Sequence, residues 1–148
     1  MPSSRRLLAV VAALAILGLT AGVAIAANAH FVGTPTCTQN NAGTANATVT
    51  CSGKIAGLGS ETTVVTVTAN GTTTCTNRGE HNPPGQTRTS GSQVFPRVHN
   101  GQITFSVTTQ PARRQCPDKM RASTTFTSAT ITVEQPPGTV VLEQTFPL

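Results

Sequence analysis

Few side chains in this sequence could carry out chemistry, and one group of them lies close together. Arg78, Glu80, His81 and Asn82 fall within a single short stretch. An imidazole beside a carboxylate can exchange protons, and a guanidinium can hold an anion. Hydrolysis, however, needs a nucleophile with a base, or two carboxylates that face one substrate, and the sequence places neither. We therefore predict a binding site at these four residues and no catalytic residue.

The sequence carries no recognisable metal or cofactor motif. No two of the four cysteines have the C-x-x-C spacing typical of zinc sites. No calcium loop, phosphate loop or dinucleotide fingerprint occurs. The chain has no Trp and no Tyr, so it lacks most of the aromatic side chains that sugar-binding modules stack on their ligands. We predict neither a metal nor a cofactor.

The N-terminal segment has the order of features found in a removable secretory signal. A positive pair, Arg5 and Arg6, precedes an apolar stretch over residues 7–17. Small residues then follow at the spacing that signal peptidase cleaves, in residues 24–26 and again in 27–29. The alternative is an uncleaved anchor helix, because the apolar span approaches the roughly 20 residues that cross a bilayer. Two glycines and the two cleavage motifs favour removal.

Removal divides the chain into a signal peptide, residues 1–29, and a secreted domain, residues 30–148. The whole chain carries ten Lys and Arg and five Asp and Glu. Without Arg5 and Arg6, eight basic residues remain against five acidic ones, and the net charge falls from +5 to +3. The remaining basic residues are scattered and form no stripe, which argues against a nucleic-acid partner. We expect an extracellular protein with no membrane attachment after cleavage.

All four cysteines lie after the predicted signal, at Cys37, Cys51, Cys75 and Cys116. An even number of cysteines in an exported chain is typical of a disulfide framework. Three pairings are possible. We favour one local bridge, Cys37–Cys51, and one bridge between distant strands, Cys75–Cys116.

The secreted domain shows the alternation of β-strands and no sustained helical period. Thr, Val and Ile recur at every second position, and Gly, Pro and Asn interrupt them. The domain is rich in threonine and poor in large side chains, with five Phe in the whole chain. We expect strands at residues 30–32, 45–51, 61–77, 93–95, 102–109, 122–134 and 140–146.

Residues 61–77 allow two interpretations. Asn70-Gly71 is a strong signal for a two-residue hairpin turn, which would divide the segment into two strands. A continuous strand, straight or bent at Gly71, would instead place one apolar set on a single face. That set is Val65, Val67, Ala69, Thr73 and Cys75. We favour the continuous strand because this inward set then stays largely apolar.

Three further features concern the connections. Residues 52–59 contain three glycines and are expected to form a link with a short strand or turn, in which Ile55 and Leu58 point inward. Residues 78–92, with Pro83-Pro84-Gly85, are predicted to be the longest irregular segment. The inward positions change parity between residues 126 and 129, which predicts a β-bulge.

Together these elements predict an all-β fold in a single domain. Seven or eight short strands with turns about every ten residues are typical of a two-sheet, immunoglobulin-like sandwich. A closed β-barrel is the alternative.

Short glycine, proline and asparagine motifs recur along the secreted domain: Gly57-Leu58-Gly59, Cys75-Thr76-Asn77-Arg78-Gly79, Asn82-Pro83, Asn100-Gly101-Gln102-Ile103-Thr104 and Cys116-Pro117. This pattern resembles that of a group of small secreted proteins of actinobacteria, and it covers most of the domain. The resemblance implies an extracellular compartment and a β fold but no activity, because none is assigned to the group. The sequence departs from the pattern at Glu80-His81, where a glycine is expected, and in the additional pair Cys37 and Cys51.

Three functions follow as hypotheses. The first is a non-enzymatic β-sandwich that binds a protein or cell-surface partner through residues 78–92. The second is a small-ligand carrier with a cleft in the sandwich, and the domain is similar in architecture to the apoprotein carriers of enediyne antibiotics. The third is a hydrolase that uses residues 78–82, and we rank it last.

Overall fold

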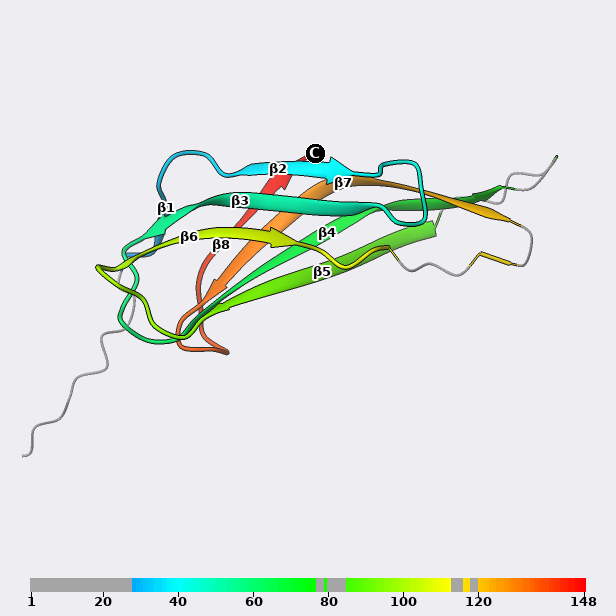
Figure 1. The fold of residues 1–148 in the computed structure, drawn as a ribbon. Coiled ribbons are helices and arrows are strands. Elements are labelled where there is room, and N and C mark those ends of the chain that lie inside the picture. The colour runs from blue at the N-terminus through cyan, green and yellow to red at the C-terminus, as the bar shows by residue number, and fades with distance from the viewer. Residues whose placement is uncertain (1–27, 77–78, 80–84, 113–115, 118–119) are drawn as a thin grey trace, which may run out of the picture.

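The computed structural model describes residues 28–76, 79, 85–112, 116–117 and 120–148 (Figure 1). The predicted signal-peptide helix falls in residues that lie outside these ranges. The described residues form eight strands: β1 (His30–Phe31), β2 (Thr36–Asn40), β3 (Thr48–Ala56), β4 (Thr63–Thr76), β5 (Gly85–Phe95), β6 (Gln102–Thr108), β7 (Arg121–Glu134) and β8 (Val140–Pro147). No helical segment in the described part of the chain has the length and apolarity that a membrane crossing requires.

The strands form two antiparallel sheets that pack face to face (Figure 1). In the first sheet β3 is central, with β1 and β2 along one edge and β6 along the other. The second sheet has the order β5-β4-β7-β8. This arrangement confirms the predicted all-β, two-sheet sandwich.

The core lies between the sheets and follows the alternation of the sequence. Every second residue of β4 points inward, and Val65, Val67 and Ala69 are fully buried. Phe105 from β6 and Phe126 from β7 are the largest of the fully buried side chains. Each residue of this kind stabilises the fold by about 1.5–3 kcal/mol relative to an exposed side chain.

Strand β4 runs through Asn70-Gly71 without a turn, so the continuous-strand interpretation is confirmed. The register between β4 and β7 shifts at this point, since Asn70 lies opposite Ser128 and Gly71 lies opposite Phe126. Strand β7 therefore contains one extra residue here, Thr127, and the predicted bulge is confirmed. The glycine is required because a Cβ on Gly71 would overlap the carbonyl oxygen of Thr125.

Residues 52–59 were predicted to be a link, and the first half of that prediction is wrong. Strand β3 continues to Ala56, because Ser52, Gly53 and Lys54 pair with β6. Gly53 marks a close approach rather than a break, since a Cβ there would lie 3.2 Å from the ring of Phe105. Ile55 and Leu58 are buried, as expected.

The prediction of an irregular segment over residues 78–92 is wrong from Gly85 onward. Residues 85–95 form β5 and pair with β4 along their whole length. Residues 93–95 thus end a strand rather than begin one, and the strand stops before Pro96. Residues 86–92 do alternate outward polar and inward small side chains, but their Gly, Ser and Thr content resembles that of a loop.

Both favoured disulfides are present. Cys37–Cys51 joins β2 to β3 at directly paired positions. Cys75–Cys116 joins the last inward-facing residue of β4 to the segment between β6 and β7. All four cysteines are thereby used.

Candidate functional site

The four residues predicted to form a binding site, Arg78, Glu80, His81 and Asn82, lie outside the described residues. Their attachment points are described, however. The segment leaves β4 after Thr76 and enters β5 at Gly85. Both of these strand ends lie at the same end of the second sheet.

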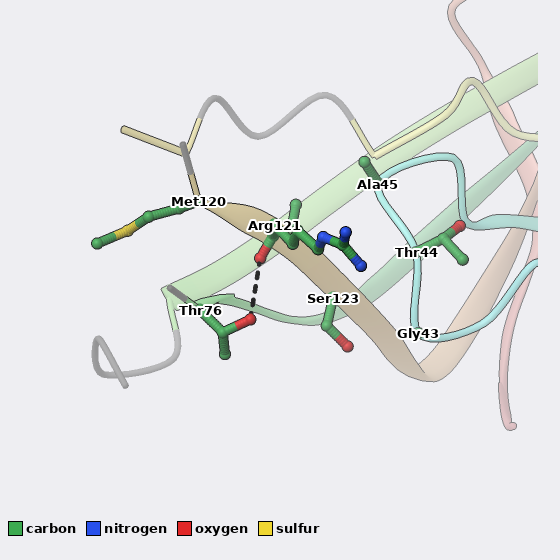
Figure 2. Close-up of a pocket in the computed structure, with 8 residues that line it drawn as sticks. Gly43, Thr44, Ala45, Thr76, Met120, Arg121 and Ser123 are labelled. Carbon is green, nitrogen blue, oxygen red and sulfur yellow. Dashed lines mark hydrogen bonds between the residues drawn. The ribbon is translucent and has the colours of Figure 1, made fainter. Parts of the chain in front are cut away.

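A cleft of about 550 Å³ opens at this same end (Figure 2). It lies between the last residue of β4, the first residues of β7 and the loop that joins β2 to β3. Its lining residues are small or polar, with one long thioether and one cation: Gly43, Thr44, Ala45, Thr76, Met120, Arg121, Ala122 and Ser123. Its volume falls in the range of about 300–1,000 Å³ that is usual for ligand sites.

The cleft forms because β8 is shorter than β7. Strand β8 pairs with β7 only over residues 128–134, which leaves the first half of that edge of β7 without a neighbouring strand. The side chain of Gln39 on β2 forms hydrogen bonds with part of that edge. Its Oε1 accepts from the backbone N–H of Phe126 at 3.0 Å, and its Nε2 donates to the Phe126 carbonyl at 2.7 Å.

The β2–β3 loop forms a hydrogen bond with the next part of the same edge. The backbone N–H of Gly43 donates to the carbonyl of Thr124 at 2.8 Å. Two left-handed residues shape the loop, Asn41 with φ 52° and Gly43 with φ 79°. The hydroxyl of Thr44 donates to the Asn41 carbonyl at 2.8 Å and closes the turn. Beyond Thr124 the loop diverges from β7, and this divergence creates the cleft.

Arg121 supplies the charge of the cleft. It is exposed at the start of β7, opposite Thr76, whose hydroxyl donates to the Arg121 carbonyl at 3.5 Å. Its side chain extends over the cleft toward the loop that carries Thr44 and Ala45 (Figure 2). Within the described part of the chain, no carboxylate forms an ion pair with Arg121. Because Arg121 is exposed, its side chain is accessible to a ligand in the cleft.

The lining residues support binding better than proton transfer. Among the described residues that line the cleft there is no Asp, Glu, His or Cys. Three of them, Thr44, Thr76 and Ser123, carry hydroxyls that can donate or accept hydrogen bonds. The cleft can thus hold an anionic or polar group, whereas general acid–base catalysis would need a group from elsewhere.

The other titratable side chains of the described residues are dispersed. Glu134 accepts from the backbone N–H of Gly138 at 2.7 Å, and Glu143 accepts from the hydroxyl of Thr132 at 3.0 Å. His30 contacts the carbonyl of Asn28 at 2.8 Å. Across the described ranges, no three His, Cys, Asp or Glu residues gather closely enough to hold a metal ion.

None of the eight residues that line the cleft was predicted from the sequence as a site residue. Nothing in the sequence connects residues 43–45 with residues 120–123, because their contact depends on where β8 stops. One usable signal exists, since Arg121 is a cation at the start of an alternating strand. Neither a protein-family model nor a curated protein matches this chain.

Proposed function

We propose that the mature chain is a secreted, non-enzymatic binding domain that contacts a protein or cell-surface partner through the end carrying the Arg121 cleft. The observation that carries this proposal is the position of the cleft. It adjoins Thr76, the residue from which the segment with Arg78, Glu80 and His81 departs. A polar segment that departs from Thr76 and an exposed cation in the adjoining cleft are thus connected through one strand end. Connections that a rigid sheet positions are frequent sites of binding.

Secretion is part of the proposal and rests on two supports. The sequence of residues 1–29 has the features of a cleavable signal. The two disulfides are consistent with an oxidising compartment outside the cytoplasm.

A small-ligand carrier is the second candidate, and the cleft volume of about 550 Å³ favours it. The lining gives it only partial support, because four of the eight lining residues carry polar side chains, whereas carrier pockets are predominantly apolar with only a few polar groups. A hydrolase that uses residues 78–82 ranks last, because the cleft residues add no acid, base or nucleophilic thiol to that segment.

Affinity capture tests the proposal. Mature protein, residues 30–148, is immobilised and exposed to culture medium and to solubilised cell wall from its own source, and bound molecules are identified and quantified. Arg121→Gln and the double variant Arg78→Ala/His81→Ala are run beside it, with Arg88→Gln as the control. Arg88 is exposed on β5 and does not line the cleft.

We expect a partner that the native protein and Arg88→Gln retain and that both end variants lose. Equal recovery by all four proteins would refute the assignment of the contact to this end. Extraction of the native protein with organic solvent, followed by mass spectrometry, tests the carrier: a stoichiometric small molecule would favour the second candidate over the first.

A further inference from the structure

We propose that the Arg121 cleft recognises an oxyanion, a carboxylate or a phosphate, that is part of a larger ligand. This inference rests on the proposed function, because it names the chemical group that the partner presents. Three features of the cleft point to this group: its charge, the Ser123 hydroxyl, which makes no hydrogen bond with a described residue, and its size.

The charge is of one sign. Among the described lining residues, Arg121 is the only ionised side chain, and it has no carboxylate partner within the described part of the chain. A guanidinium presents several N–H donors in a planar fork that matches two oxygens of a carboxylate or phosphate. Such charge-assisted hydrogen bonds are shorter and stronger than neutral ones.

A second donor faces the same space. The hydroxyl of Ser123 makes no hydrogen bond with a described residue, whereas the hydroxyls of Thr44 and Thr76 are already engaged. Ser123 lies across from Gly43, and a Cβ on that glycine would come within 3.9 Å of the hydroxyl. Figure 2 shows the Ser123 hydroxyl on the loop side of β7, below the guanidinium. The loop backbone at Gly43 thus comes close to the Ser123 hydroxyl.

The size of the cleft favours an anionic group that is part of a larger ligand over a free ion. A space of about 550 Å³ is far larger than a carboxylate or a phosphate. An isolated anion would contact Arg121 and Ser123 and leave the rest of the cleft to water. The same group carried on a chain would also contact Ala45 and Ala122, so we expect polyanions to bind more tightly than the free ions.

Solution NMR tests the proposal. Isotopically labelled mature protein with both disulfides formed is titrated with sodium acetate and sodium phosphate, and then with poly-glutamate and polyphosphate. The acetate and poly-glutamate arms report on carboxylates, and the other two report on phosphates. We expect chemical-shift changes at the Arg121 side-chain N–H and at the amides of Gly43 and Ser123, with the larger affinity for the polymers.

Variants separate a site from general attraction between charges. Arg121→Gln should lose about tenfold or more in affinity for the preferred polyanion. Ser123→Ala should lose less, and Arg88→Gln and Ser106→Ala, which alter exposed residues outside the cleft, should bind as the native protein does. Arg121 and Arg88 are both exposed, so neither substitution should unfold the protein. The NMR spectrum of each variant checks this directly.

Two outcomes would overturn the inference. One is the absence of shifts around the cleft with all four probes, and the other is an equal loss of affinity in Arg121→Gln and Arg88→Gln. Either result leaves the proposed function testable on its own, because affinity capture with the Arg78/His81 variant does not depend on anion binding. A partner that is captured through this end without any anion binding would reject the oxyanion and keep the binding domain.

Discussion

Gln135 shows how a single polar residue holds two connections of the sandwich together. It is fully buried at the end of β7. Its Oε1 accepts from the N–H of Gly59 at 2.6 Å, and its Nε2 lies within 3.1 Å of the carbonyl of Gly59 and within 2.8 Å of the hydroxyl of Thr63. Glu61 contributes a further carbonyl at 3.0 Å. The β3–β4 connection is thereby fixed to the end of β7.

Replacing Gln135 with Leu should destabilise the protein by about 2–4 kcal/mol, because the part-buried backbone groups of Gly59 and Glu61 and the buried hydroxyl of Thr63 lose their partner. The chain has no Trp and no Tyr, so circular dichroism during urea unfolding is the suitable measurement. Gln144→Leu is the matched control, since Gln144 is exposed on β8 and should change stability by less than about 0.5 kcal/mol. Equal midpoints for the two variants would contradict the role given to Gln135.

At the scale of the element, alternation predicted strands well and composition predicted connections poorly. The inward parity of Val65, Val67 and Ala69 identified β4 as one strand despite Asn70-Gly71. The alternation is much weaker in β5, whose inward residues include Thr87, Thr89 and Gly91. Those small side chains carry little hydrophobic signal, so the strand resembled a loop in the sequence.

Gly91 illustrates why such a strand needs small residues. Strand β5 lies beside β6 at the edge where the two sheets meet, and the N–H of Gln110 donates to the carbonyl of Ser90 at 3.0 Å. A Cβ on Gly91 would overlap the carbonyl oxygen of Thr108. The approach of the two backbones is a tertiary property, and no local pattern in residues 85–95 reports it.

The bulge at residue 127 gives a prediction of its own. Gly71→Ala should destabilise the protein by about 2 kcal/mol or more, because the new Cβ meets a fixed backbone carbonyl at Thr125. Gly53→Ala should cost less, since its Cβ would meet side-chain atoms of Phe105 and Pro35 at 3.2 and 3.3 Å, and these can shift. Urea unfolding of both variants measures the difference. A smaller loss for Gly71→Ala than for Gly53→Ala would show that the β4–β7 contact adapts.

For the whole molecule, the class of fold and the disulfides could be predicted, but the site could not. Strand alternation, turn residues and an even number of cysteines are local or countable features of the sequence. The Arg121 cleft, in contrast, depends on three lengths: that of β8, that of β7 and that of the loop around Gly43. The ends of strands are harder to predict from sequence than the strands themselves, so a site that lies between strand ends is equally hard to predict.

The two disulfides make the stability of the whole domain depend on whether its surroundings are oxidising or reducing. The cysteines of the first bridge are 14 residues apart and those of the second are 41 apart. In the chain-entropy picture these loops contribute about 3 and about 4 kcal/mol, together about 7 kcal/mol. A domain of this size usually has a total stability of about 5–15 kcal/mol. The core cannot readily compensate, because only two of its five Phe, Phe105 and Phe126, are fully buried.

Complete reduction should therefore leave the mature protein unfolded or marginally stable, whereas loss of either bridge alone should leave it folded. The measurement is urea unfolding by circular dichroism on four samples: the oxidised protein, the reduced protein, Cys37→Ala/Cys51→Ala and Cys75→Ala/Cys116→Ala. We expect each double variant to lose about 3–4 kcal/mol and the reduced protein to lose close to the sum. A reduced protein that unfolds at the same urea concentration as the oxidised one would contradict this account. It would also remove one support for the proposed secretion, since a domain that is stable without its disulfides could fold in the cytoplasm, where thiols stay reduced.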